Sequence, residues 1–240
     1  MRIAVVSDVH SNLVALDAVL ADAGPVDAVW HLGDVVGYGP DPNGVVDRLR
    51  QLGAVGVRGN HDAAAVGGLE IELFNPEARA AMEWTRAAIS ETTRTWLRAL
   101  PISRSEGELT LVHGSPRDPT WEYLTSAAVA RGSFEVLPTP HGLNGHTHLP
   151  AAFVLIEDRV AVARTRDGDQ LSLAGTRTLL NPGSVGQPRD GDPRASYLIL
   201  DPDGAVATWH RVDYDVGAVQ GAMTGAGLPS RLAARLAHGV

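Results

Sequence analysis

Three short apolar runs alternate with two helical patterns in the first sixty residues of the chain. The runs cover residues 2–7, 26–32 and 54–58, and apolar side chains recur at helical spacing in residues 13–22 and 43–52. A strand–helix–strand–helix–strand series favours a parallel sheet with helices packed on it. The beginning of the chain therefore predicts an α/β fold.

The rest of the chain is first helical and then rich in strand patterns. Residues 76–99 read as helices, with Trp84 and Trp96 among the apolar positions. Beyond residue 102 we expect short strands joined by tight turns such as Pro202-Asp203-Gly204. The expected strands are residues 108–112, 152–163, 170–174, 177–180, 195–200 and 205–212. A short amphipathic helix is expected from residue 228.

Polar side chains follow five of the apolar runs, at the point where each run ends. The segments are Asp8-Val9-His10, Gly33-Asp34, Gly59-Asn60-His61-Asp62, His113-Gly114 and Gly145-His146-Thr147-His148. Ligands of open α/β sheets collect beyond the carboxyl ends of the strands, and glycine lets the backbone turn sharply there. One such residue is more often a turn residue or a helix cap, but the repeated pattern indicates one shared site.

The composition narrows the chemistry of that site. The chain contains no cysteine, so disulfides and thiolate metal sites are excluded, and a metal would need His, Asp, Glu or Asn ligands. All twenty basic residues are arginine, which excludes a catalytic lysine.

The charge and the amino-terminal segment limit partners and location. The formal net charge is −8, which disfavours a protein that depends on contacts with a nucleic-acid backbone. The apolar run Ile3 to Val6 is too short for a signal peptide or a membrane helix. We therefore expect a soluble, cytoplasmic protein without a membrane partner, and the sequence leaves the oligomeric state open.

Taken in order, the five polar segments resemble the calcineurin-like metallophosphoesterase superfamily. The series reads D-x-H, G-D, G-N-H-D, H-G and G-H-T-H and spans residues 8 to 148. Three further segments, VGYGPDP (36–42), HGSPRDP (113–119) and NPGSVGQPR (181–189), resemble a small bacterial branch that contains phosphodiesterases and dinucleoside-polyphosphate hydrolases. The resemblance implies a four-layer α/β/β/α sandwich of two mixed sheets. We expect a single domain over residues 1–240, with a helical insertion at about 64–100.

The resemblance also implies a ligand set for two metal ions. Asp8, His10, Asp34 and His148 would hold one ion. Asp34, Asn60, His113 and His146 would hold the other, with the Asp34 carboxylate bridging the two. Oxygen and imidazole ligands without sulfur suit Mn, Fe or Zn.

The implied reaction is hydrolysis of a phosphate ester or anhydride. Two ions about 3.5–4 Å apart can clamp a phosphoryl group, and a hydroxide bridging them attacks phosphorus. In the family the histidine matching His61 protonates the leaving oxygen, and Asp62 would orient or charge its ring. The bland alternative for His61 is a structural role beside the metal ligands. The expected substrate is a small phosphorylated molecule, with a nucleotide or a dinucleoside polyphosphate among the candidates.

Substrate-binding residues are less well defined by the sequence. Among the arginines near the polar segments, Arg58, Arg117 and Arg189, the last two are candidate phosphate ligands. Asn181 and Ser184 are either phosphate-binding or core-turn residues. Tyr38, Trp121 and Tyr123 could stack on a nucleobase or simply pack. The remaining histidines, His31, His141, His210 and His238, match no motif, and we interpret them as structural or exposed.

Three alternative functions fit the sequence less well than the leading interpretation. A serine/threonine protein phosphatase or a symmetrical tetraphosphatase would carry an arginine-bearing G-D-x-V-D-R-G segment and G-N-H-E, whereas this chain has GDVVGYG and Asp62. A repair nuclease is disfavoured by the acidic balance and the short chain. A non-catalytic scaffold on the same fold is disfavoured because every ligand position and His61 are present.

Overall fold

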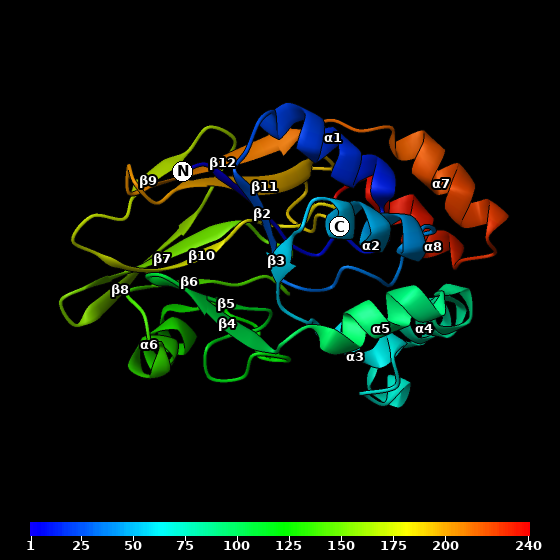
Figure 1. Cartoon of the computed structure of the whole chain (residues 1–240), viewed down its shortest axis with the longest axis horizontal. Helices are drawn as coiled ribbons and strands as arrows, with labels where there is room; N and C mark the ends of the chain where they lie inside the picture. The colour runs from blue at the N-terminus through cyan, green and yellow to red at the C-terminus, as the bar shows by residue number, and fades with distance from the viewer.

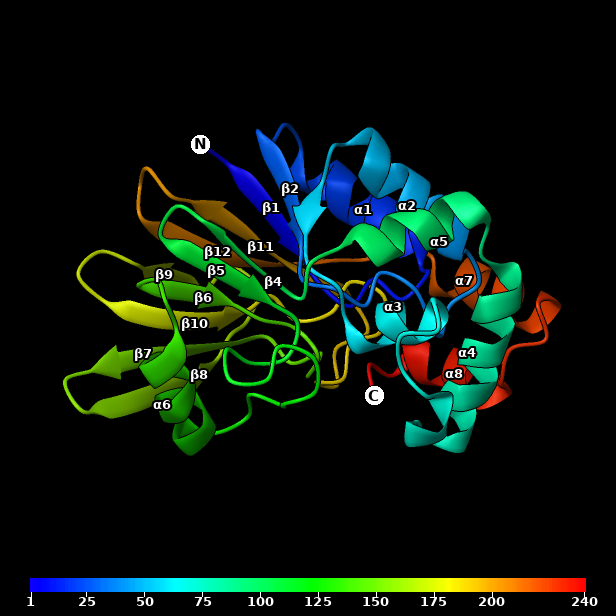
Figure 2. The same cartoon turned by 60° about the horizontal axis from the view of Figure 1, so that its bottom comes forward.

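The computed structural model describes residues 1–240, without the side chain of Leu73. Two six-stranded sheets face each other, with helices on both outer sides, and the carboxyl ends of the central strands point to the same side of the molecule (Figures 1 and 2). This is the expected α/β/β/α sandwich.

The first sheet, sheet A, is mixed and contains the three expected parallel strands. Its order is β3-β2-β1-β11-β12-β9, in which β1, β2 and β3 run parallel and β11 pairs antiparallel with β1. The six strands are β1 (Ile3–Val6), β2 (Ala28–His31), β3 (Val55–Gly56), β9 (Gln170–Ser172), β11 (Ala195–Asp201) and β12 (Val206–Val212).

The second sheet, sheet B, is also mixed and has the order β4-β5-β6-β10-β7-β8. Within it β5, β6 and β10 run parallel, whereas the outer pairs β4–β5 and β7–β8 are antiparallel. Its strands are β4 (Ser103–Glu106), β5 (Leu109–Val112), β6 (His141–Leu143), β7 (Ala151–Ile156), β8 (Arg159–Arg164) and β10 (Arg177–Asn181).

The helices cover the outer faces and one end of the sandwich (Figure 1). Helices α1 and α2 pack on sheet A, α6 packs on sheet B, and α3, α4 and α5 lie beside α2. The helices are α1 (Leu13–Ala23), α2 (Pro42–Gln51), α3 (Asn60–Ala65), η1 (Ile71–Leu73), α4 (Pro76–Ala88), α5 (Glu91–Ala99), α6 (Ala127–Val136), α7 (Val216–Gly225), α8 (Ser230–Ala234) and η2 (Arg235–Ala237). That residues 64–100 form an insertion into a single domain stays a prediction.

One core layer lies between the sheets and sets the direction of the strand ends. It includes Ile3 and Val5 from β1, Trp30 from β2, and Leu109 and Leu111 from β5. Burial of such side chains is the main stabilising term of the sandwich. The packed layer fixes the strands, so that the polar residues following them are held in place.

Several sequence-based expectations need correction. The run 152–163 is a hairpin of β7 and β8 rather than one strand, and the GNHD segment leads into α3, a helix that the sequence interpretation did not include. The sequence interpretation missed β4, α6 and α7. Strand β4 is polar and exposed except for Glu106, so it carries no apolar alternation. None of the described helices combines the length and apolar character needed to cross a bilayer.

Candidate metal centre

Seven polar side chains meet where five strands end. Sheet A delivers Asp8 and His10 after β1, Asp34 after β2 and Asn60 after β3, and sheet B delivers the rest after β5 and β6. The seven residues are Asp8, His10, Asp34, Asn60, His113, His146 and His148, and each is at most 5% exposed. Charged and imidazole groups buried this deeply require partners or a bound ion.

The first cluster consists of Asp8, His10 and His148, whose candidate ligand atoms all lie within 4.8 Å of one another. The Nε2 atoms of His10 and His148 are 3.2 Å apart, and His148 Nε2 is 3.3 Å from Asp8 Oδ1. Asp34 Oδ2 lies 3.7 Å from His10 Nε2. Four candidate ligands therefore surround one point.

The second cluster consists of Asp34, His113 and His146, with Asn60 beside them. His113 Nε2 lies 3.3 Å from Asp34 Oδ2, 3.0 Å from Asn60 Oδ1 and 3.1 Å from His146 Nδ1. The same Oδ2 atom of Asp34 thus lies close to a histidine of each cluster. This carboxylate is placed where a bridging ligand would have to be.

The outer nitrogens of three histidines show which atoms face the clusters. Nδ1 of His10 lies 3.2 Å from the carbonyl oxygen of Val36, and Nδ1 of His148 lies 2.5 Å from that of Gln187. Nδ1 of His113 lies 2.8 Å from the carbonyl oxygen of residue 32. A carbonyl oxygen only accepts, so Nδ1 carries a proton in each ring, and in its neutral form each ring presents the Nε2 lone pair to the cluster.

This arrangement fits metal binding. Without a cation, the facing lone pairs of His10 and His148 at 3.2 Å would repel each other. Asp8 Oδ1 is buried and has no hydrogen-bond partner, although Oδ2 accepts from the Ser7 hydroxyl at 2.6 Å and from the His146 backbone N–H at 3.1 Å. Oxygen and nitrogen atoms whose lone pairs converge in this way are the ligands that a transition-metal ion takes.

His146 is held differently from the other three histidines. Its Nδ1 faces the second cluster, and its buried Nε2 has no hydrogen-bond partner among the described residues. Instead, the ring of Tyr123 stacks on it at a centroid distance of 4.1 Å and an interplanar angle of 15°, with Trp121 edge-on at 6.5 Å. Tyr123 is 51% exposed, so this side of the second cluster reaches solvent.

The backbone is strained at the strand ends that carry the candidate ligands. Asp8, His10, Asp34, His146 and His148 all have φ values between 48° and 64°. The left-handed region is uncommon for residues with a Cβ and is tolerated where the surrounding structure enforces it. Such positions cluster at functional sites, which agrees with the location of these five.

Histidine 61 lies beside both clusters without belonging to either. Its backbone N–H donates to Asp34 Oδ1 at 2.8 Å, and its ring contacts His10 and Tyr38 at centroid distances of 4.9 and 4.5 Å. A Cβ at position 37 would overlap the ring nitrogen Nδ1, so the glycine there makes room for this ring. Burial lowers the pKa of His61 to about 4.

Asp62 has a structural set of contacts. Its Oδ1 accepts from the backbone N–H of Val36 at 3.1 Å, and its Oδ2 accepts from that of Gly59 at 3.0 Å. The expected contact with the ring of His61 is not among these bonds. Asp62 fixes the loop after β2 to the start of α3, and thereby positions Asp34 and His61 relative to each other.

The candidate substrate-binding residues fall into two groups. Arg189 donates to Gln187 Oε1 at 2.8 Å, and its guanidinium lies 5.9 Å from the centre of the Tyr38 ring, beside the first cluster. Tyr38 is only 7% exposed and packs against α7 and α8. Arg117 is instead bound to the carboxylate of Glu122, so its guanidinium is already paired.

The remaining candidate residues, Arg58, Asn181 and Ser184, form hydrogen bonds that hold neighbouring elements and loops in place. Arg58 donates to a backbone carbonyl of α5. Asn181 donates to the carbonyl oxygen of Gly145 at 2.8 Å and to the Thr147 hydroxyl at 3.0 Å. Ser184 donates to the carbonyl oxygen of Asp8 at 2.8 Å. These contacts support the core-turn interpretation of Asn181 and Ser184.

Two residues of the site were missed by sequence reasoning. The Ser7 hydroxyl orients Asp8, and Gln187 accepts from His148 through its backbone and from Arg189 through its side chain. Gln187 lies in the NPGSVGQPR segment, but a role played by a backbone carbonyl leaves no signal in residue type.

Burial and neighbouring charges set the protonation of the candidate ligands. Burial lowers the pKa of His10 and His148 well below the usual value and that of His146 to about 3. Burial also lowers the pKa of His113, but the Asp34 carboxylate outweighs this and raises it to about 9. A metal entering the second cluster would therefore displace a proton from His113.

Comparison with known proteins gives one consistent result. The profile of the calcineurin-like phosphoesterase superfamily domain matches residues 1–205. The chain is 35% identical to an uncharacterized protein of Methanocaldococcus jannaschii over 98% of this chain and 96% of that protein. It is 34% identical to a symmetrical bis(5'-nucleosyl)-tetraphosphatase of Pectobacterium carotovorum, over 52% of this chain and 47% of that enzyme.

Solved structures agree. A crystal structure of a metallophosphoesterase from Sphaerobacter thermophilus has a TM-score of 0.91 and 48% identity, covering 100% of this chain and 99% of the other. A hypothetical protein from Pyrococcus horikoshii has a TM-score of 0.82 at 19% identity, covering 100% and 98%, which shows a shared fold.

Proposed function

The chain belongs to the calcineurin-like phosphoesterase superfamily and is a metal-dependent phosphoric ester hydrolase. From this premise we propose a dinuclear metal centre that acts on a nucleotide-type substrate. The observation that carries the proposal is the position of Asp34 Oδ2, 3.7 Å from His10 Nε2 and 3.3 Å from His113 Nε2. One carboxylate oxygen between two sets of lone pairs is what a two-ion site needs.

In this proposal each cluster holds one ion. Asp8, His10 and His148 share the first ion with Asp34, and Asn60, His113 and His146 share the second with Asp34. Two such ions polarise a phosphoryl oxygen and lower the pKa of a water molecule. The ligand types suit Mn, Fe or Zn, and the absence of cysteine excludes a thiolate site.

We assign His61 the proton transfer to the leaving oxygen. Its ring lies between Tyr38 and His10 at the edge of the first cluster, and Nδ1 is packed against Gly37. The other nitrogen, Nε2, is then left for substrate. Although burial lowers its pKa, the negative charge of a bound phosphate ester favours the protonated ring.

Arg189 is the candidate that holds the phosphate. It is half-buried beside the first cluster, where burial lowers the pKa of His10 and His148 and the charge of Arg189 adds to that lowering. Gln187 fixes the guanidinium at its Nε and Nη2 atoms. Its remaining N–H groups can bind a phosphoryl oxygen.

The organic part of the substrate is placed beside the second cluster. Tyr123 is half-exposed, and Trp121 lies edge-on to the same histidine, His146, so a nucleobase can stack there. Tyr38 is not available for stacking, because its ring is already in contact with His10, His61 and the guanidinium of Arg189. The chain matches a symmetrical tetraphosphatase over about half its length but differs from that branch at GDVVGYG and Asp62. The named activity of that relative supports the class of substrate, a nucleotide or a dinucleoside polyphosphate.

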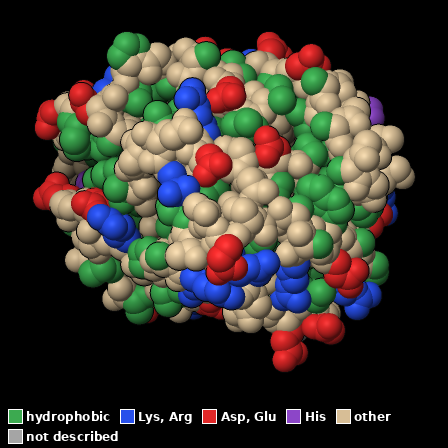
Figure 3. Space-filling view, turned by 45° about the vertical axis from the view of Figure 1, so that its right-hand side comes forward, with side chains coloured by type: hydrophobic (Ala, Val, Ile, Leu, Met, Phe, Trp, Pro, Cys, Tyr) green, Lys and Arg blue, Asp and Glu red, His purple; other side chains and the backbone are tan. Residues whose placement is uncertain are grey.

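Surface charge gives no competing indication. On the face in Figure 3, basic and acidic side chains are interspersed, and the net charge is −8. A continuous basic stripe would be expected for binding to a nucleic-acid backbone. A small phosphorylated substrate therefore remains the proposal.

Metal analysis and a substrate panel test the proposal together. Purified protein loaded with Mn²⁺ and desalted should retain two ions per chain, by mass spectrometry, and His238→Ala, which removes an exposed histidine outside both clusters, should retain the same number. The panel compares phosphomonoesters, bis-p-nitrophenyl phosphate, cyclic nucleotides and dinucleoside polyphosphates. Stable binding of no more than one ion, or two ions without activity on any member, would favour the scaffold alternative.

A further inference from the structure

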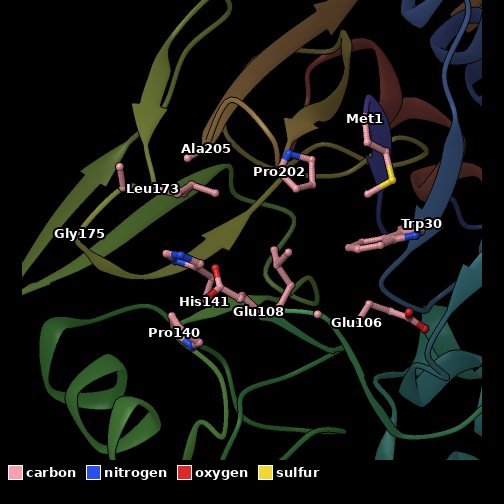
Figure 4. A pocket seen from close by; sticks show the side chains of 13 residues that line it. Met1, Trp30, Glu106, Glu108, Pro140, His141, Leu173, Gly175, Pro202 and Ala205 are labelled. Carbon is pink, nitrogen blue, oxygen red and sulfur yellow. The ribbon is translucent and has the colours of Figure 1, made fainter.

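A cavity lies at the opposite end of the sandwich from the candidate metal ligands. Its volume is about 490 Å³, within the range of small-molecule sites, and it opens between the two sheets where β5 and β6 begin (Figure 4). The central strands run from this end toward the metal ligands at their other ends. The cavity is therefore separate from the proposed active site.

His141 supplies a polar atom from inside the core layer. It is the first residue of β6, two positions before the inward-facing Leu143, and is 7% exposed. Its Nδ1 lies 2.9 Å from the hydroxyl of Thr178 in the adjacent strand β10, and Nε2 has no hydrogen-bond partner among the described residues. Figure 4 shows the ring projecting into the cavity. Because Nε2 is unpaired and not fully enclosed, it is open to the cavity and can hydrogen-bond to water or to a ligand there.

The other walls define the shape and charge of a ligand. Trp30 comes from the opposite sheet and is 7% exposed, and Leu173 and Pro140 add apolar surface. Two carboxylates, Glu106 and Glu108, lie at the turn between β4 and β5. Glu106 is paired with Arg104, whereas Glu108 has no ion pair among the described residues.

These groups select one ligand class. The indole of Trp30 favours a planar aromatic body, and a free carboxylate favours a cationic amine. Phosphate is disfavoured because Glu108 would repel it, and the N-terminal ammonium of Met1, the cation among the lining residues, is already paired with Asp203.

We propose that this intersheet cavity is a second ligand site, which binds a small aromatic amine through Trp30, His141 and Glu108. The aromatic ring lies against Trp30, the ammonium group pairs with Glu108, and His141 Nε2 hydrogen-bonds to a polar group of the ligand.

Binding of tryptamine compared with indole-3-acetate tests the proposal. Saturation-transfer NMR and calorimetry on the full chain should show one tryptamine per chain, with the acid at least about 10-fold weaker, because a charge pair is replaced by repulsion. Chelation of metal should leave tryptamine binding unchanged, since the two sites are at opposite ends.

Variants locate the site. Glu108→Gln changes an exposed side chain and should weaken tryptamine about 10-fold while the protein keeps its melting temperature, and His141→Phe should weaken it without filling the cavity. Glu83→Gln, an exposed glutamate on α4, is the matched control and should have no effect. Equal binding of amine and acid, no binding at millimolar concentration, or affinity unaltered by Glu108→Gln would overturn the proposal.

Discussion

The two clusters of candidate metal ligands differ in what holds their histidines. In the first, Nδ1 of His10 and of His148 each faces a backbone carbonyl, and the Ser7 hydroxyl fixes Asp8. In the second, only His113 has such a carbonyl partner, while His146 rests on the half-exposed ring of Tyr123.

The two clusters also differ in charge. The first combines two carboxylates with two imidazoles. The second shares Asp34 and also has two imidazoles, but it has the neutral amide of Asn60 in place of the other carboxylate. A preorganised site with more negative charge binds a cation more tightly. We therefore expect the first cluster to be the permanent metal site, and the second to be the more exchangeable one that opens toward substrate.

Replacing Asp34 should have the largest effect on metal content and activity, because both clusters share its carboxylate. Asp34→Ala removes the oxygen shared by both and should lose both ions and reduce activity to background. Asn60→Ala should lose only the second ion. Metal content by mass spectrometry after desalting measures this, and two ions retained by Asp34→Ala would contradict the bridging role.

Lowering the pH should have the next largest effect, because it should weaken metal binding at one cluster before the other. The pKa of His113 is about 9 because Asp34 outweighs burial, so metal binding to the second cluster must displace its proton below that pH. Burial raises the pKa of Asp8 to about 7, so the first cluster meets proton competition only below pH 7. From pH 9 to 7, Mn²⁺ affinity should fall by up to about tenfold per pH unit at the second cluster only. Calorimetric titrations at pH 9, 8 and 7 measure this, and equal losses at both clusters would count against the assignment.

Removing His61 should leave both clusters loaded while slowing the reaction. General acid catalysis contributes about 10²–10⁴-fold, so His61→Ala should lose a factor in that range on an alkyl or nucleoside ester. The loss should be clearly smaller on a p-nitrophenyl ester, whose leaving group is stable without the proton. Single-turnover rates with both substrates decide, and equal losses with metals intact would instead indicate that His61 positions phosphate.

The smallest effect should come from the ring under His146. Partners of a metal-binding histidine typically contribute about 10–100-fold in metal affinity, and a stacked ring in place of a hydrogen bond should lie at the lower end. Tyr123→Leu should weaken the second ion about 10-fold and leave the first unchanged, whereas Tyr123→Phe, which keeps the ring, should restore binding. Weakening of both ions by Tyr123→Leu would show that the loop supports the whole centre.

The location of the candidate site was predictable from the sequence, but its details were not. Asp8 and Asp34 lie within three residues of the ends of neighbouring parallel strands, so their convergence follows from pattern alone. His113 follows a strand of the other sheet, and its approach to them depends on how the two sheets pack. The paired state of Arg117 depends on Glu122 five residues on, which a run of charges does not reveal. The orientation of His148 depends on the backbone of Gln187, thirty-nine residues away in sequence.

The strand series was likewise predictable where burial imposes a pattern. The runs that form β1, β2 and β5 are apolar because their side chains are buried in the core between the two sheets. Strand β4 is largely exposed and consists of polar residues, so it carries no such pattern. The role of His141 required the position of the opposite sheet, because a single inward-facing histidine looks the same in sequence as a structural one.

Each cluster draws side chains from both sheets: His148 joins residues of sheet A in the first, and Asn60 and Asp34 join residues of sheet B in the second. An ion in either cluster would therefore act as a cross-link between two halves of the sandwich. In a chain without cysteine, this takes the place of disulfide bonds in resisting separation of the sheets. A ligand that binds only the folded state stabilises it in proportion to the logarithm of its concentration, so the melting temperature should rise with metal concentration. Chelation should weaken the contact between the two sheets before it affects either sheet.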